Sequence, residues 1–265
     1  QNVHRHRHRS RDTGDQDRLE ASESELASEA SSDAAAPSYY PYPYPGRSYV
    51  WQSGDVTDFD LGMTEGRTAV LAVGSNRAPS RLDQKYIGKY EVPIPVQHAR
   101  LKDFDIVYAA HLTRYGSVPA MLQRAPGTTV ELAVTWLDDE QLEIMHATEG
   151  GYYYAEIEGV DLTYDDGTRA DSVHLYVGRE GHLVHEAQPV ALIEIDGEDR
   201  PHAARNTAQV LEIVHQRVAP DMPHDDFILR VIEDTGFRRD CSIQMSEDAV
   251  PFDYPYAKKP GGLID

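Results

Sequence analysis

Two repeating patterns of apolar residues run through the middle of the chain. Between residues 130 and 137 every second residue is apolar: Val130, Leu132, Val134 and Trp136. Side chains two residues apart lie on the same side of an extended chain, so this pattern predicts a β-strand with one buried face. Leu142, Met145 and Glu149 are instead three and four residues apart, which places them on one face of a helix that Asp138 would cap.

The same patterns predict the other secondary structure elements of the chain. Strands are expected over residues 68–73, 104–112, 130–137, 152–164, 172–177 and 190–195, and helices over 204–218 and 224–234 in addition to the helix after Asp138. The Asp-Asp-Gly at residues 165–167 is typical of a hairpin turn, and Gly236 is expected to end the last helix. Strands with interspersed helices favour an α+β or mixed α/β fold.

The predicted elements divide the chain into three regions. Residues 1–50 are predicted to form a disordered low-complexity arm, because such a polar segment buries too little apolar surface to offset its ordering entropy. Residues 51–220 are predicted to be the main domain, with its first strand near Thr68. Residues 221–265 are predicted to be a helical extension followed by a Pro- and Gly-rich surface tail.

The N-terminal arm carries two features of its own. His4, His6 and His8 alternate with arginine and could bind a metal weakly, although a flexible basic arm is the simpler interpretation. The Tyr/Pro run at residues 39–46 favours extended polyproline-like backbone. It is interpreted as a linker, with a docking strip as the alternative.

Charge and cysteine content narrow the classes of function. The 265 residues include 45 acidic and 25 basic side chains, for a net charge of −20, of which residues 1–50 contribute little with eight acidic and six basic residues. A polyanion such as nucleic acid or an anionic membrane is therefore not expected as a partner. No apolar run approaches the ~20 residues of a membrane helix. The lone Cys241 excludes an internal disulfide and a Cys-based zinc site, and we expect a soluble cytoplasmic protein.

Two positions are candidates for chemistry. The turn Val73-Gly74-Ser75-Asn76 follows a predicted strand, and successive N–H groups in such a turn can hold an anion, although most such turns only reverse the chain. Glu149 is placed in the last turn of its helix on the core side. Burial and the negative end of the helix dipole would both raise the pKa of this carboxyl, as an acid/base group requires. The alternative is a solvated glutamate before the Gly150-Gly151 cap.

Four short segments, taken in order, resemble the γ-glutamylcyclotransferase-like family. They are Ala72 to Asn76, Tyr115 to Ala120, Pro126-Gly127 before a strand, and Thr148-Glu149-Gly150 before a Tyr-rich strand. The family pattern is a strand leading to YGSN, a Gly-x-Pro-Ala segment, a Pro-Gly strand entry and a helix ending in Glu-Gly. The resemblance covers residues 68–195. It implies a small, mixed β-barrel with flanking helices.

The resemblance also implies a reaction and a set of site residues. In that reaction the α-amine of a γ-glutamyl group attacks its own γ-carbonyl, releasing 5-oxoproline and an amine, with no cofactor and no metal. Glu149 matches the acid/base glutamate of the family, and the turn at 73–76 matches its substrate-holding turn. The substrate-binding candidates are Val73, Gly74, Ser75, Asn76, Tyr115 and Tyr154. The expected partner is a small γ-glutamyl compound, and the sequence does not decide whether the protein is a homo-oligomer.

This sequence departs from the family pattern in two places. Val73 stands where the family usually has tyrosine, and no later substrate-contacting tyrosine is found between Pro189 and Asn206. Tyr115, Tyr152, Tyr153 and Tyr154 are available as substitutes, and Tyr115 and Tyr154 are taken as the substrate-binding candidates. A metal site at His146 and Glu149 lacks a third ligand, and core packing or solvation at the helix end is preferred for His146. The alternatives are a catalytically silent ligand-binding or assembly protein on the same fold, or related amide or ester chemistry on another acyl group.

Overall fold

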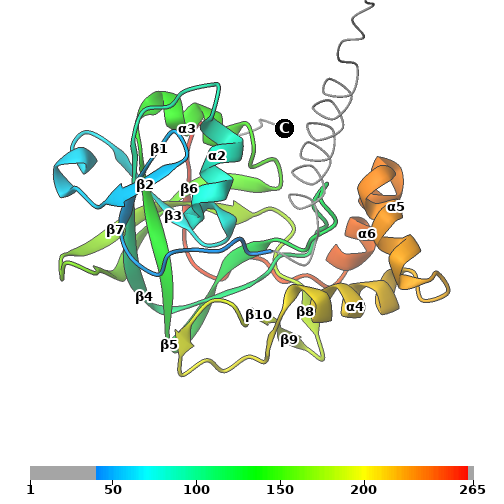
Figure 1. Ribbon diagram of the computed structural model, residues 1–265. Coiled ribbons are helices and arrows are strands. Elements are labelled where there is room, and N and C mark those ends of the chain that lie inside the picture. Colours follow the sequence, from blue (N-terminus) through cyan, green and yellow to red (C-terminus); the bar gives the residue numbers. More distant parts are fainter. Residues whose placement is uncertain (1–39, 262–265) are drawn as a thin grey trace, which may run out of the picture. The chain divides into compact units, whose positions relative to one another are not determined.

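The computed structural model describes residues 40–261, and its centre is a closed ring of long strands (Figure 1). The ring consists of β3 (Thr68–Ala72), β4 (Ile94–Tyr108), β5 (Ala120–Leu137), β6 (Tyr152–Tyr164) and β7 (Arg169–Gly178). Hydrogen bonding runs from β4 through β5, β3, β7 and β6 and returns to β4. All of these pairs are antiparallel except β3–β7, which is parallel. The predicted mixed β-barrel with flanking helices is confirmed.

Strands β4 and β5 are longer than the sequence pattern predicted. Their pairing shifts register between Lys102 and Phe104, where Asp103 has a φ of 67°. The Asp103 carboxylate accepts a hydrogen bond of 2.8 Å from the N–H of Gly127, whose own φ is 89°. A β-bulge of this kind bends a strand without ending it. Pro126 and Gly127 therefore lie within one continuous strand, although their sequence is typical of a break.

Shorter strands extend the sheet from the ring. They are β1 (Tyr49–Gln52), β2 (Asp55–Asp58), β10 (Ala191–Leu192), β11 (Gly197–Glu198), β12 (Ala204–Arg205) and β13 (Ala257–Lys258). Two further strands, β8 (Val184–His185) and β9 (Gln188–Pro189), form a separate two-stranded sheet. The expected strand over 190–195 is reduced to β10, which pairs with β4 and β12. The C-terminal tail contributes β13, which pairs with β6, and both residues of β13 are exposed, as a surface tail requires.

The folded region begins earlier than predicted. Tyr49 and Trp51 in β1 are 0% exposed, and β1 pairs with β4. The boundary of the predicted arm at residue 50 is therefore wrong for residues 40–50, because these aromatic side chains bury enough surface to order the segment. The histidines at positions 4, 6 and 8 lie outside the described residues.

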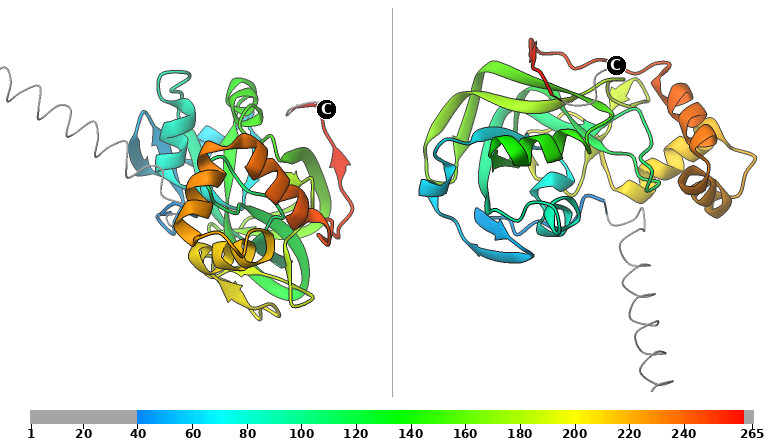
Figure 2. Two further views of the ribbon diagram at one scale, coloured as in Figure 1. Left: turned by 90° about the vertical axis from the view of Figure 1, so that its right-hand side faces the viewer. Right: turned by 90° about the horizontal axis from the view of Figure 1, so that it is seen from above.

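The helices lie against two sides of the ring. Two of them, α2 (Pro79–Tyr86) and α3 (Asp139–His146), cover β1 and β3, whereas α4 (Thr207–Val218), α5 (His224–Glu233) and α6 (Thr235–Ser246) group beside the strands, as Figure 2 shows. Short 3-10 turns follow β2 and β3, namely η2 (Leu61–Thr64) and η3 (Ser75–Arg77). The sequence pattern missed α6. Gly236, expected to end a helix, lies in its first turn, where the Asp234 side chain caps the helix.

Successive residues of β3 face two different hydrophobic cores. Leu71 joins the main core, which continues to α5 and α6 through buried residues such as Phe227 and Cys241. Val70 and Ala72 join a second core with Leu82 and Tyr86 of α2, and with Tyr49 and Trp51. Among the described residues, no helix is long and apolar enough to cross a membrane. The second core positions α2 and α3 around the predicted site.

Candidate functional site

The predicted glutamate lies just beyond α3, in the turn that leads to β6. The helix begins with a capping box, in which the Asp138 side chain accepts from the N–H of Gln141 and the Gln141 side chain accepts from the N–H of Asp138. It ends at His146, whose carbonyl accepts a hydrogen bond of 3.2 Å from the N–H of Glu149. Glu149 is therefore three residues past the helix, and its predicted place in the last helical turn is wrong.

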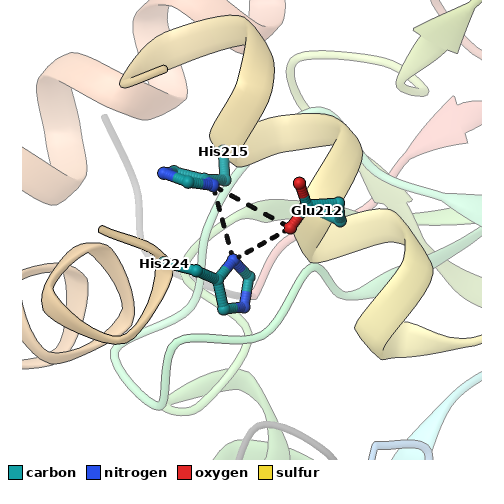
Figure 3. A group of neighbouring side chains, drawn as sticks. All are labelled: Glu212, His215 and His224. Atoms are coloured by element: carbon teal, nitrogen blue, oxygen red, sulfur yellow. Dashed lines mark hydrogen bonds and ion pairs between the residues drawn. The ribbon is translucent and has the colours of Figure 1, made fainter. Parts of the chain in front are cut away.

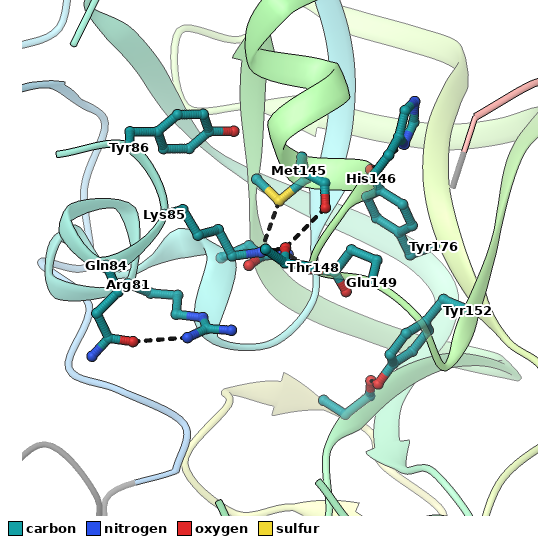
Figure 4. Close-up of polar contacts among 12 residues, drawn as sticks. Arg81, Gln84, Lys85, Tyr86, Met145, His146, Thr148, Glu149, Tyr152 and Tyr176 are labelled. Carbon is teal, nitrogen blue, oxygen red and sulfur yellow. Dashed lines mark hydrogen bonds and ion pairs between the residues drawn. The ribbon is translucent and has the colours of Figure 1, made fainter. Parts of the chain in front are cut away.

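Two side chains from earlier in the chain hold the carboxylate of Glu149, and Figure 4 shows one of them, that of Lys85, beside it. Lys85 of α2 places its Nζ 2.7 Å from Glu149 Oε1, and Asn76 of η3 donates from Nδ2 to the same oxygen at 3.1 Å. The side chain of Glu149 is 12% exposed and that of Lys85 is 1% exposed. The structure thus brings the turn at residues 73–76 and Glu149 together around a buried ion pair.

This ion pair reverses the predicted pKa of Glu149. Burial by itself raises the pKa of the carboxyl, but Lys85, the hydrogen bond from Asn76 and the charge of Arg81 together hold it below its usual value. The expected rise is wrong because a cation in the chain supplies the counter-charge that the sequence interpretation did not include. Burial lowers the pKa of Lys85 in turn, while the charge of Glu149 opposes that shift.

Lys85 is the site residue that sequence reasoning missed. Besides Glu149, its Nζ donates to Thr148 Oγ1 at 2.7 Å and to Met145 Sδ at 3.0 Å. Figure 4 shows the side chain reaching across from α2 between these acceptors. A signal was present in the sequence. Leu82, Lys85 and Tyr86 are spaced three and four apart and are all buried, so Lys85 lies on the apolar face of α2.

The side chain of Tyr40, which precedes the barrel in the sequence, packs against Gly74 in the turn after β3. A Cβ atom built on Gly74 would lie 2.5 Å from the Tyr40 hydroxyl, and the same hydroxyl accepts a hydrogen bond of 2.6 Å from the N–H of Ala120. Burial raises the pKa of Tyr40, and the nearby carboxylate of Glu149 raises it further. Tyr40 was placed in the disordered arm by the sequence interpretation, and it lies instead at the predicted substrate turn.

One polar atom of the turn has no partner within the described chain. The hydroxyl oxygen of Ser75 is buried and makes no hydrogen bond to any described residue. Buried hydroxyl groups are normally hydrogen-bonded. The hydroxyl of Ser75 therefore has a hydrogen-bonding capacity that no described residue uses.

Tyr152 and His111 lie near enough to Glu149 for its charge to act on both. The hydroxyl of Tyr152 donates to the carbonyl of Ala120 at 2.9 Å, and its ring meets the imidazole of His111 edge-on at 5.6 Å. Burial lowers the pKa of His111 to about 4, so its imidazole is neutral at physiological pH. The Nδ1 atom of His111 is buried without a partner in the described part of the chain. Besides the charged Lys85, Glu149 thus also has neutral, aromatic neighbours.

The two tyrosines taken as substitutes lie in different places. Tyr115 is on the Arg81 side of the site, with the guanidinium of Arg81 5.7 Å from its ring centre. Tyr154 is buried in another cluster, edge-on to His146 at 4.5 Å and stacked on His174 at 5.3 Å. His146 is buried and hydrogen-bonded to Tyr176 at 2.8 Å, in agreement with the preferred packing role. The role of each tyrosine in substrate binding stays a prediction.

Comparisons with known proteins give weak structural similarity. No family model and no curated protein matches the sequence. A solved structure described as a gamma-glutamyl cyclotransferase is 19% identical, with a TM-score of 0.31, over 41% of this chain and 64% of that chain. A crystal structure of an uncharacterized protein from Homo sapiens is 15% identical, with a TM-score of 0.32, over 81% of this chain and 95% of that chain. The chain thus spans 64% of the length of the first of these structures.

Proposed function

We propose that the protein is a γ-glutamylcyclotransferase-like enzyme that releases 5-oxoproline from a γ-glutamyl amine or peptide. The observation that carries the proposal is the contact of 3.1 Å between Asn76, in the turn after β3, and the buried carboxylate of Glu149. A group able to accept a proton and a turn able to hold an anion thus meet at one place. Intramolecular attack needs this combination, because the substrate must be folded back on itself while a proton is moved.

The proposed step needs little beyond positioning and proton transfer. The α-nitrogen forms a bond to the γ-carbonyl carbon, and the bond from that carbon to the leaving nitrogen breaks. The α-nitrogen loses two protons as the α-ammonium becomes the lactam N–H: Glu149 takes one and returns it to the leaving nitrogen, and the second follows the same route, so the amine leaves as its ammonium form. The lowered pKa keeps the carboxylate ionised at neutral pH, which favours attraction of the α-ammonium but works against the proton uptake that the step requires. Both described hydrogen bonds to the carboxylate go to Oε1, which leaves Oε2 for the substrate.

The α-carboxylate of the substrate requires hydrogen-bond donors of its own. The backbone N–H groups of residues 73–76 and the unpartnered hydroxyl of Ser75 are the donors proposed for it. The guanidinium of Arg81, which influences the pKa of Glu149, adds positive charge at the same side. No metal or organic cofactor enters the proposed step.

The proposal is tested by incubating the protein with a panel of γ-glutamyl amines, amino acids and peptides and measuring 5-oxoproline. We expect product from at least one compound, and a loss of about 10²-fold or more in kcat for Glu149→Gln. Glu143→Gln, on the exposed face of α3, is the matched control and should keep full activity. Thermal unfolding checks that each variant is folded. The proposal fails if no compound yields product, or if Glu149→Gln matches the wild type.

A catalytically silent binding or assembly protein is the second candidate. It is favoured by two contacts, the ion pair between Lys85 and Glu149 and the position of Tyr40 over Gly74, because both occupy groups that the reaction would use. Calorimetry with the same γ-glutamyl panel separates the two candidates. Binding without any 5-oxoproline would support the silent protein.

A further inference from the structure

A second cluster of ionisable side chains lies on the C-terminal helices. Glu212 and His215 are one turn apart on α4, and His224 is the first residue of α5. Figure 3 shows the three side chains turned toward one another, with the Nδ1 atoms of both rings facing the Glu212 carboxylate. The sequence pattern placed these residues on predicted helices and assigned them no role.

The distances in this cluster fit a small metal ion. Glu212 Oε2 lies 3.2 Å from His224 Nδ1 and 3.9 Å from His215 Nδ1, and the two Nδ1 atoms are 3.4 Å apart. Nitrogen and oxygen ligands bind zinc at ~2.0–2.1 Å, so two ligand atoms of a tetrahedral site are separated by ~3.3 Å. The three ligand atoms therefore already stand at nearly the separations that one shared ion requires.

The tautomer of His215 is fixed in the form that a metal ligand needs. Its Nε2 lies 2.7 Å from the backbone carbonyl of Met222, which can only accept a hydrogen bond, so the proton is on Nε2. In the neutral imidazole the lone pair of Nδ1 then faces Glu212 and His224. Metal-binding histidines commonly donate their second N–H to a carbonyl in this way. The ring is also held by Phe227, at 5.1 Å, and its side chain is 4% exposed.

We propose that Glu212, His215 and His224 bind one divalent transition-metal ion of the zinc type. The alternative is a hydrogen-bonded cluster in which one proton on His224 Nδ1 is shared with the other two atoms. The side chains of Glu212 and His224 are 54% and 39% exposed, so an ion can enter from solvent and keep water at its fourth position. The ion would join α4 to the start of α5 across the loop at residues 219–223.

The experiment uses the full chain, stripped of metal with a chelator. Because His4, His6 and His8 could also bind metal, they are replaced together by asparagine in a reference variant. Calorimetry with Zn²⁺ should give one equivalent bound to this variant, and Co²⁺ should give the visible absorption of a tetrahedral site. His224→Ala in the same background should lower the affinity at least tenfold and remove the Co²⁺ absorption.

A matched control and two outcomes decide the proposal. His185→Ala, another incompletely buried histidine, should leave binding unchanged. The proposal is overturned if the reference variant binds no Zn²⁺, or if His224→Ala binds as tightly as the reference. Equal thermal unfolding of the metal-free variants shows that any loss of binding is not a loss of folding.

A second inference concerns Tyr40 and rests on the proposed function. We infer that Tyr40 is a removable cover of the turn at Gly74. Its hydroxyl accepts a hydrogen bond from the backbone N–H of Ala120 and fills the space that Gly74, lacking a side chain, leaves open. The carbonyl of Tyr40 is hydrogen-bonded by the Thr207 hydroxyl, so the segment is held at both the turn and α4. A substrate carboxylate at the turn would have to displace the Tyr40 hydroxyl.

The cover is tested with Tyr40→Ala, and Tyr40→Phe serves as the variant that removes the hydroxyl alone. We expect Tyr40→Ala to raise kcat/KM for 5-oxoproline formation, and to tighten binding of γ-glutamyl compounds, by about tenfold, a change of about 1.4 kcal/mol. If the wild type forms 5-oxoproline and Tyr40→Ala changes neither binding nor activity, the inference about Tyr40 is overturned and the proposed function is not. If neither the wild type nor Tyr40→Ala forms 5-oxoproline, the proposed function fails, and the change in binding of γ-glutamyl compounds still decides whether Tyr40 is a cover.

Discussion

The clusters at Glu149 and at Glu212 are each built around a carboxylate, but they differ in the groups that lie against its negative charge. Glu149 is 12% exposed and is paired with Lys85, a cation that the chain itself supplies. Glu212 is 54% exposed and faces the Nδ1 atoms of His215 and His224. No lysine or arginine side chain is described in contact with this carboxylate. A carboxylate paired with a lysine of the same chain needs no ligand to balance its charge. A carboxylate that faces imidazole nitrogens can bind an added cation together with them.

The largest effect is expected from removing the built-in cation. Lys85→Met leaves the buried carboxylate of Glu149 with Asn76 as its remaining described partner, and should lower the free energy of unfolding by about 3–5 kcal/mol. Urea denaturation measures the loss. Replacing both residues, as Lys85→Met with Glu149→Gln, should recover part of it because no buried charge is left.

The control for this change is an ion pair near the surface. Lys259 and Glu156 are 2.6 Å apart, with side chains 36% and 21% exposed. Lys259→Met should cost under about 1 kcal/mol, since partly solvated pairs contribute little. If Lys85→Met cost no more than this control, the ion pair would not hold the site, and the contrast between the two clusters would be lost.

A smaller effect of the same pair is expected on acidification. Because the pKa of Glu149 in the folded protein is below its ordinary value of 4.5, its contribution to stability is fully present above about pH 4.5. That contribution is lost as the pH falls through the folded-state pKa. The difference in unfolding free energy between the wild type and Glu149→Gln should therefore shrink below pH 4.5. A difference that does not change down to pH 3 would contradict the lowered pKa.

Added metal should stabilise the cluster at Glu212 and leave the cluster at Glu149 unchanged. At a hundredfold excess of Zn²⁺ over its dissociation constant, the metal-stripped reference variant should gain about 2.7 kcal/mol of stability. Hydrogen exchange should show the added protection in α4 and α5, with no change around Lys85 and Glu149. Protection that appears equally in both regions would mean that the ion acts elsewhere.

The smallest effect is expected where the two regions are built alike. Both α3 and α4 begin with a capping box, made by Asp138 with Gln141 and by Asn206 with Gln209. Asp138→Ala and Asn206→Ala should each lower the unfolding free energy by about 1 kcal/mol. Since the caps share no partner, the double variant should show the sum within about 0.5 kcal/mol. A clearly larger combined loss would show that the two caps are energetically coupled.

Local patterns in the sequence predicted most of the barrel because strand alternation and helix caps are written in neighbouring residues. The strand at Tyr152–Tyr164 and the cap at Asp138 are examples. The bulge at Asp103 was missed because it depends on Gly127, which lies across the strand pair. Lys85 and Tyr40 were missed for the same reason. Their contacts to Glu149 and Ala120 span 64 and 80 residues, and no local spacing encodes such contacts.

The position of Tyr40 also fixes an order in which the molecule can be assembled. Its hydroxyl bonds to Ala120 and its carbonyl to Thr207, which is synthesised 167 residues later. Contacts of such long range form late, because the intervening chain must first be made and brought together. On the ribosome the carbonyl of Tyr40 can therefore reach its partner only after Thr207 has been synthesised, and one contact of the first described residue has to wait for α4.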